Sequence, residues 1–288
     1  MKRMNETILF ALMLLFLLAS GGSAEPISKA YPFSMEYNPD RTLLNTIRTP
    51  SGYERFPTKK MNMFMAWITN LPLKPKDFPV VKWDTQKLMS ADSTCGVIDI
   101  GVTSMNQKDA DMPIHLVLEF LRAANQLEQY PILVSDGDTV KYENWLNGKY
   151  TKDARGNLIY KKGDARQSTE KEYYRYLEFV MSRIDSRTLL HNLIPIEAKD
   201  VAPGCLYVQF SPEDADSIGH TSIIFDVAVG KTDESNLLLL AGWGGIPAHN
   251  LYIARPLPVS SAIWFTVDEL KEHLAEYGKG QFYKLKFF

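Results

Sequence analysis

The chain has 288 residues and a formal net charge of −2 at pH 7, so it lacks the basicity typical of proteins that bind nucleic acid or anionic membranes. Hydrophobic residues make up 45% and aromatic residues 11%, which excludes a disordered chain and allows a sizeable core. We therefore expect one domain over residues 25–288, and the charge gives no reason to expect nucleic acid or an anionic membrane as its partner.

The first 24 residues have the pattern of a secretory signal peptide. Lys2 and Arg3 precede an apolar run over residues 8–18, and small residues up to Ala24 suit cleavage. The apolar run is shorter than the roughly 20 residues that a membrane-spanning helix needs. We therefore predict export to the periplasm or the extracellular space, with no membrane span after cleavage.

The N-terminal half of the mature chain is predicted to contain helices joined by short extended pieces. Periodicity and Pro/Gly signals predict helices over residues 61–70, 109–126 and 170–183, and strands at 80–83, 97–100 and 132–134. The polar, glycine-containing stretch 147–168 is predicted to be a long exposed loop.

The helix over residues 109–126 has one apolar and one polar face. Its apolar positions recur at helical spacing and predict a buried stripe of Ile114, Val117, Leu118 and Leu121. The opposite face carries Asp111, His115, Glu119, Arg122 and Gln126. We expect His115 to be solvated or paired with Glu119 one turn away, rather than to act as a base.

The C-terminal half is predicted to be mostly β. Apolar, β-branched runs predict strands over residues 205–210, 221–229, 237–241, 251–254 and 281–288. Thr266 and Glu269 fit a capping box that opens a helix ending at Gly278. Helices followed by an antiparallel sheet make an α+β order rather than a βαβ repeat.

The chain contains two cysteines, Cys95 and Cys205, both in apolar strand-like surroundings. Two buried thiols are the default expectation, and one disulfide is the alternative that the spacing leaves open. The sequence has neither a Cys-x-x-Cys nor a His-Glu-x-x-His motif, so we predict no metal site and no cofactor.

The segment Gly219–Asp226 places one histidine, His220, at the start of a β-branched apolar run. A cysteine hydrolase keeps its general base in such a position, at the rim of a sheet. Regular alternation along the strand predicts that Ser222, Ile224 and Asp226 share the side of His220. Ile223 and Phe225 are then expected to be buried with the apolar stripe of the 109–126 helix.

Four segments together resemble the bacterial family named domain of unknown function 4846. They are residues 64–75, the spaced residues Gly137, Tyr142, Trp145 and Gly148, the segment 219–226, and residues 239–248. That family is in turn similar to papain-like, NlpC-type cell-wall peptidases. The resemblance implies a papain-like scaffold, with helices packed on an antiparallel sheet formed mostly by the C-terminal half.

In papain-like enzymes a cysteine at a helix N-terminus attacks the substrate, and a histidine at a strand start takes its proton. His220 matches this histidine, whereas the position of the cysteine falls on Asp109, which has no thiol. We therefore expect Asp109 and His220 to lie within direct or one-water reach, on a scaffold whose chemistry has been lost or replaced.

Three functional hypotheses follow. The first is a catalytically inactive envelope protein that binds peptidoglycan or glycan fragments, or another envelope protein, near His220. Trp145, Trp243 and His249 are its candidate ligand-binding residues, and core packing is the alternative role of each tryptophan.

The second hypothesis is an active cysteine hydrolase, a peptidase or amidase of cell-wall peptides, that uses Cys95 and His220 as catalytic residues. Cys95 precedes a strand rather than a helix, so nothing in the sequence lowers its pKa. The third hypothesis is metal-assisted chemistry with His220, His249 and either Asp226 or Asp109 as ligands. The spacing of His220 and Asp226 along one strand argues against it.

Overall fold

The structure is a computed structural model that describes residues 29–134, 138–210, 219–256 and 262–288. The predicted signal peptide, residues 1–24, lies outside the described residues. Within the described ranges, no helix has the length and apolar character required to cross a membrane.

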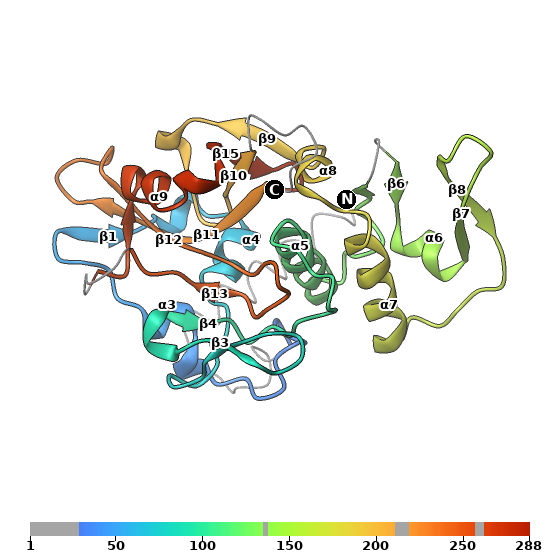
Figure 1. The fold of residues 1–288 in the computed structure, drawn as a ribbon, viewed down its shortest axis with the longest axis horizontal. Helices are drawn as coiled ribbons and strands as arrows, with labels where there is room; N and C mark the ends of the chain where they lie inside the picture. Colours follow the sequence, from blue (N-terminus) through green and yellow to red (C-terminus); the bar gives the residue numbers. More distant parts are fainter. Residues whose placement is uncertain (1–28, 135–137, 211–218, 257–261) are drawn as a thin grey trace.

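The helices and strands alternate along the first two thirds of the chain, and strands dominate the rest (Figure 1). The described α-helices are α3 (Leu43–Thr46), α4 (Met63–Ile68), α5 (Asp111–Ala123), α6 (Tyr142–Leu146), α7 (Glu170–Met181), α8 (Ser186–Leu190) and α9 (Val267–His273), and a 3₁₀ turn, η6 (Ala275–Tyr277), follows α9. The strands are β1 (Tyr53–Arg55), β2 (Val80–Val81), β3 (Lys87–Met89), β4 (Gly96–Val97), β5 (Ile132–Leu133), β6 (Thr139–Val140), β7 (Gly148–Lys152), β8 (Leu158–Lys162), β9 (Leu193–Ile196), β10 (Leu206–Phe210), β11 (His220–Gly230), β12 (Leu237–Trp243), β13 (Tyr252–Ile253), β14 (Phe265–Thr266) and β15 (Lys279–Leu285).

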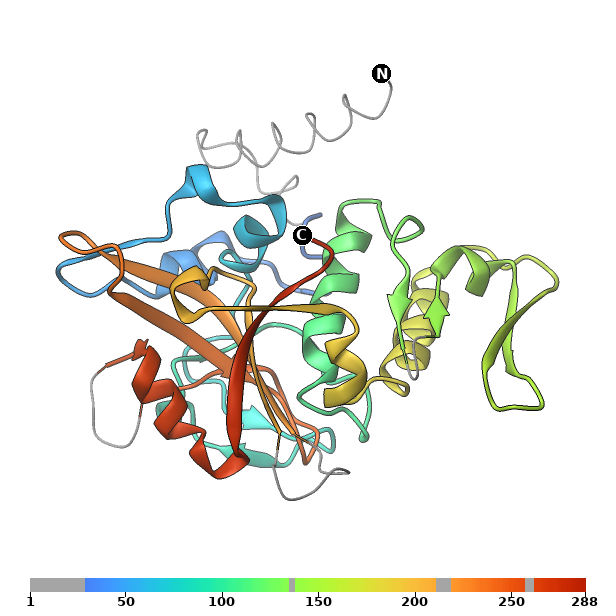
Figure 2. The same ribbon diagram turned by 90° about the horizontal axis from the view of Figure 1, so that it is seen from above.

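The large sheet is antiparallel and follows the order β4-β13-β12-β11-β10-β15-β9, with β1 added to β11 and β14 added to β12. One of its faces packs on α5 and the other on α9, and Figure 2 shows these helices on opposite sides of β11 and β12. Ile223 and Phe225 lie in one core cluster with the apolar stripe of α5, as predicted. The α+β architecture with a C-terminal antiparallel sheet is therefore confirmed.

The predicted capping box is also present. The Thr266 hydroxyl accepts the Glu269 N–H at 3.1 Å, and the Glu269 carboxylate accepts the Thr266 N–H at 2.7 Å. The helix α9 begins there and gives way to η6, after which Gly278 turns the chain at a φ of 94°. This positive φ suits glycine and directs the chain into β15.

A β-bulge on β11 overturns the predicted alternation. Ile224 is opposite Ala241 but Asp226 is opposite Leu240, so one residue, Phe225, is inserted between them. The bulge moves Asp226 to the α3 side of the sheet, away from the side of His220 and Ile224.

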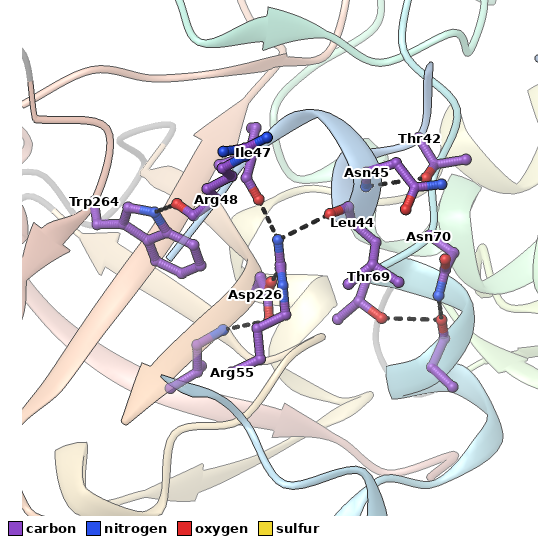
Figure 3. Close-up of polar contacts among 12 residues, drawn as sticks. Thr42, Leu44, Asn45, Ile47, Arg48, Arg55, Thr69, Asn70, Asp226 and Trp264 are labelled. Atoms are coloured by element: carbon purple, nitrogen blue, oxygen red, sulfur yellow. Dashed lines mark hydrogen bonds and ion pairs between the residues drawn. The ribbon is translucent and has the colours of Figure 1, made fainter. Parts of the chain in front are cut away.

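On that side, Asp226 is fully buried and forms an ion pair with Arg55 of β1 (Figure 3). Arg55 also donates to the carbonyl of Leu44 at 3.1 Å and to that of Ile47. The Val227 N–H donates to the second carboxylate oxygen of Asp226 at 2.8 Å. The carboxylate therefore joins α3, β1 and β11 and is not available as a ligand near His220.

The polar face of α5 is covered, so His115 is not solvated, and the predicted alternative of a pair with Glu119 is the one that the structure shows. Asp111, His115 and Glu119 are buried, and the His115 Nε2 atom lies 3.7 Å from a Glu119 carboxylate oxygen. The segment carrying α7 and α8 folds back over this face, and Lys108 donates to the carbonyl of Ile184 at 2.7 Å. Periodicity within one helix cannot reveal such a non-local cover.

The stretch 147–168 is a β-hairpin rather than a loop without secondary structure. Strands β7 and β8 pair over five positions, from Gly148 opposite Lys162 to Lys152 opposite Leu158. The Asp153 carboxylate accepts the N–H groups of Arg155 and Asn157 and closes the turn. This side-chain turn reverses the chain between the two strands. The polar composition of the segment led to the prediction of a loop.

Candidate functional site

His220 is the first residue of β11 and lies opposite Gln209 of β10. It is only 5% exposed, because the strand is buried along its whole length and both of its neighbours are strands of the main sheet. The sequence prediction of a histidine at a strand start is confirmed.

Asp109 joins the start of α5 to the start of β11. One of its carboxylate oxygens, Oδ2, lies 2.7 Å from Nδ1 of His220 and accepts the Thr221 N–H at 3.0 Å. The other, Oδ1, accepts the Ala110 N–H at 2.9 Å. The predicted contact of Asp109 with His220 is confirmed, and the carboxylate binds the imidazole directly.

The contact lies in the wall of a cavity of about 390 Å³. The lining residues are Leu88, Met89, Asp109, Gly219, His220, Trp243, Gly245, Ile246, His249, Tyr252 and Tyr277. The Tyr277 ring stacks on His220 with centroids 4.3 Å apart, and Trp243 meets the imidazole edge to face at 5.2 Å. The cavity therefore offers aromatic surfaces beside two imidazoles.

His249 reaches the same cavity from the loop between β12 and β13. Its Nδ1 lies 2.6 Å from the Pro247 carbonyl, and Gln107 holds the backbone by donating to the His249 carbonyl at 3.0 Å. Burial lowers the pKa of His249, although the Pro247 carbonyl and the Asp109 carboxylate act in the opposite direction. The lowered pKa favours the neutral form of the His249 imidazole.

The Nε2 atoms of His220 and His249 are buried and have no hydrogen-bond partner within the described residues. A buried polar atom without a partner costs free energy, and a ligand or ordered water that supplies the partner recovers it. Since both Nδ1 atoms are already engaged, the two Nε2 atoms are the buried side-chain atoms of the lining residues that still lack a hydrogen-bond partner in the described part of the chain.

Cys95 is not brought to His220. It precedes β4, and the register from Gly96 through Ile253 and Gly242 to Ile223 crosses three strand spacings, about 14 Å. Burial raises the pKa of the Cys95 thiol to about 11, although the charge of Arg255 lowers it. The thiol is thus far from the imidazole and protonated at neutral pH.

Both cysteines are free thiols, so the disulfide that the sequence left open is not present. Cys205 is buried, and burial raises its pKa to about 11 as well.

Trp145 lies elsewhere, on α6. It packs on Phe179 and Tyr176 of α7 with centroids 5.0 and 6.1 Å away, and Arg166 covers its ring. Of the three predicted ligand-binding residues, Trp243 and His249 line the cavity and Trp145 does not. The prediction that Trp145 lies at the site is therefore wrong.

Metal ligation has no support from the geometry. Among the residues that the structure describes, no group of three or more His, Cys, Asp or Glu side chains could hold a metal ion. Asp226 is engaged by Arg55 on the opposite side of the sheet.

Sequence reasoning missed Tyr277 and Gln209. The Gln209 amide donates to the carbonyls of Leu274 and Gly278 at 2.6 and 2.9 Å, which fixes the turn that carries Tyr277. A glutamine inside a strand that is otherwise apolar was the one available signal, because such a buried amide needs fixed partners.

Comparison with known proteins gives a family but no activity. The family model described as "Domain of unknown function (4846)" matches residues 43–287. Neither the comparison with curated proteins nor that with solved structures found a match.

Proposed function

The chain belongs to the family described as domain of unknown function 4846, and we propose that it is a catalytically inactive, exported papain-like scaffold that binds a cell-envelope ligand. The ligand is a peptidoglycan or glycan fragment, or a peptide of another envelope protein, and it occupies the His220 cavity. The observation that carries this proposal is the carboxylate of Asp109 beside His220.

The papain-like part of the proposal is supported by the relative position of two elements. A helix start and a strand start face each other, and the side chain at the helix start reaches the histidine at 2.7 Å. A cysteine hydrolase requires this juxtaposition of nucleophile and base. Here the group at the nucleophile position is a carboxylate that already accepts three hydrogen bonds from the protein.

The inactive part is supported by the composition of the wall. Among the described residues that line the cavity there is no cysteine, serine, threonine or lysine. An imidazole oriented by a carboxylate can hold a proton, but covalent catalysis also needs a nucleophile in contact with it. The cysteine hydrolase alternative requires Cys95, whose thiol is three strands away.

The binding part is supported by the aromatic surfaces and the two free imidazole nitrogens. Tyr277 and Trp243 offer flat apolar faces on which a sugar ring or a peptide can pack. The Nε2 atoms of His220 and His249 have no partner in the described protein, so they are the groups that this proposal pairs with the ligand. This combination of apolar walls with a few fixed polar groups is typical of small-ligand sites.

The proposal is tested with purified protein and a set of peptidoglycan fragments. We expect saturable binding by calorimetry, quenching of tryptophan fluorescence, and recovery of every fragment intact by mass spectrometry. His220→Gln and His249→Gln should each weaken binding about tenfold, since each removes one buried hydrogen-bonding group. His191→Gln, at an exposed histidine remote from the cavity, is the matched control. Fragment cleavage that His220→Gln abolishes would overturn the proposal.

A further inference from the structure

The β7–β8 hairpin projects from the body of the molecule, beyond α6 and α7, in both views (Figures 1 and 2). Its cationic residues are Lys149, Lys152, Arg155, Lys161 and Lys162, and its one carboxylate is Asp153. Five positive charges and one negative charge give residues 148–162 a net charge of +4. Because the whole chain carries −2, the remainder carries −6. The structure thus segregates positive charge on one projecting element.

These charges have no partners in the part of the chain that the structure describes. All five cationic side chains are exposed, and none of them forms an ion pair. Lys149 lies directly opposite Lys161 across the ladder, an arrangement of like charges that destabilises a strand pair. A two-stranded hairpin is only marginally stable, so this repulsion lowers the stability of an element that has little to spare. The positive charges therefore do not serve the stability of the fold.

The base of the hairpin is hydrogen-bonded to both ends of α6 and to Arg166, and Tyr150 stacks on Phe179 of α7. The Lys141 N–H donates to the Tyr150 hydroxyl at 2.7 Å, and Arg166 donates to the Gly148 carbonyl at 2.6 Å. The Tyr160 hydroxyl donates to the Asn147 carbonyl at 2.9 Å. The positive charges are therefore presented on a fixed support, which reduces the entropy lost when a partner binds.

The distribution of charge over the two faces of the hairpin selects the kind of partner. Residues that pair across a ladder share a face, so Lys149 and Lys161 lie on one face and Lys152 and Lys162 on the other. A flat lipid surface would contact one face alone. Because the hairpin is a two-stranded sheet, both of its strands are edges, and a linear polymer can follow one edge over about 14 Å and meet lysines of both faces there.

We propose that the β7–β8 hairpin is a docking site for a linear anionic polysaccharide that bears carboxylate or phosphate groups. The choice of a polysaccharide over a nucleic acid rests on the exported location in the proposed function. The charged surface of the hairpin is separate from the His220 cavity, so its binding does not depend on that cavity. Docking there would hold the protein on an acidic polymer while the cavity remains free for its own ligand.

The experiment measures binding to polygalacturonate by calorimetry at low and at physiological salt, with uncharged dextran as the reference polymer. We expect binding to polygalacturonate alone, weakening as salt rises. The hairpin variant Lys149→Gln/Lys152→Gln/Lys161→Gln/Lys162→Gln should lose at least about tenfold in affinity, because it removes four exposed charge contacts. Circular dichroism confirms that the variant is folded.

The matched control changes the net charge equally at four exposed lysines of the body: Lys59→Gln/Lys76→Gln/Lys171→Gln/Lys231→Gln. This control should keep its affinity within about twofold. An equal loss of affinity for polygalacturonate in both variants would show that binding depends on net charge alone, and it would overturn the proposal. Stronger binding to phosphatidylglycerol vesicles or to duplex DNA than to polygalacturonate would replace the polysaccharide with a membrane or a nucleic acid. His220→Gln should leave polymer binding unchanged, which separates this test from that of the cavity.

Discussion

The replacement Asp109→Cys tests whether the helix start and the histidine form a papain-like pair. It places a thiol at the start of α5, beside the Nδ1 atom that Asp109 now contacts at 2.7 Å. Thiols beside a histidine at a helix start have pKa values of about 7.5 or lower, so at least about a quarter of them are thiolate at pH 7.

The two native thiols provide an internal reference. Burial raises the pKa of both Cys95 and Cys205 to about 11. At pH 7 their thiolate fraction is therefore about one in ten thousand. The new cysteine should react with iodoacetamide roughly a thousandfold faster than either of them, since the thiolate is the reactive form.

Peptide mass spectrometry after timed alkylation, from pH 5 to pH 9, gives the rate and the pKa at each cysteine. Asp268→Cys is the matched control, because it places a thiol in the first turn of α9, at an exposed position. In the double variant Asp109→Cys/His220→Gln the midpoint should return towards the ordinary value of about 8.5. If Asp109→Cys titrates like Asp268→Cys, or keeps its low midpoint without His220, the papain-like pairing is refuted.

Three further substitutions test interactions that determine the stability of the fold. Burial raises the pKa of Asp111 to about 7, although the hydrogen bond from the Lys108 N–H acts in the opposite direction. The protonated carboxyl therefore contributes its full stability below about pH 4, and this contribution is lost as the pH rises through 7. Asp111→Asn should therefore raise the free energy of unfolding by up to about 4 kcal/mol at pH 8 and leave it nearly unchanged at pH 4, as measured by urea denaturation. Asp226→Asn should cost about 2–4 kcal/mol at pH 7, because it leaves the Arg55 guanidinium without its counter-charge, and an unchanged urea midpoint would contradict this role. Thr266→Ala should cost about 1 kcal/mol by loss of the cap of α9, and thermal unfolding followed by circular dichroism would detect it.

Local patterns predicted the elements well, and the failures arose where distant segments meet. The apolar stripe of α5 and the strand β11 follow from spacing alone, because each buries side chains at a fixed period. The bulge at Phe225 depends on pairing with β12, which residue spacing within β11 does not encode. The covered polar face of α5 likewise depends on α7 and α8, which follow it in the chain and pack over it.

The site was predicted in part for the same reason. Asp109 and His220 were linked through family resemblance, which carries information about three-dimensional proximity that the spacing of the two residues lacks. Trp145 was grouped with them on its residue type, although it packs on α7. Tyr277 was missed because an aromatic residue at the end of an amphipathic helix shows the same local pattern whether its ring faces solvent or stacks on an imidazole.

The position of Asp109 connects the stability of the fold to the shape of the cavity. Its carboxylate binds the first two residues of β11 and the N–H of Ala110, so the mutual placement of sheet and helix depends on the same oxygens that orient His220. A thiolate at this position could not accept all three hydrogen bonds, because one sulfur atom replaces two separated oxygens. Under the proposed papain-like relationship, an aspartate in place of the nucleophile fixes the imidazole through a carboxylate that accepts three hydrogen bonds, and it supplies no thiol. A ring held in this way leaves its Nε2 atom without a partner in the described protein, which is the feature that the proposed ligand-binding role uses.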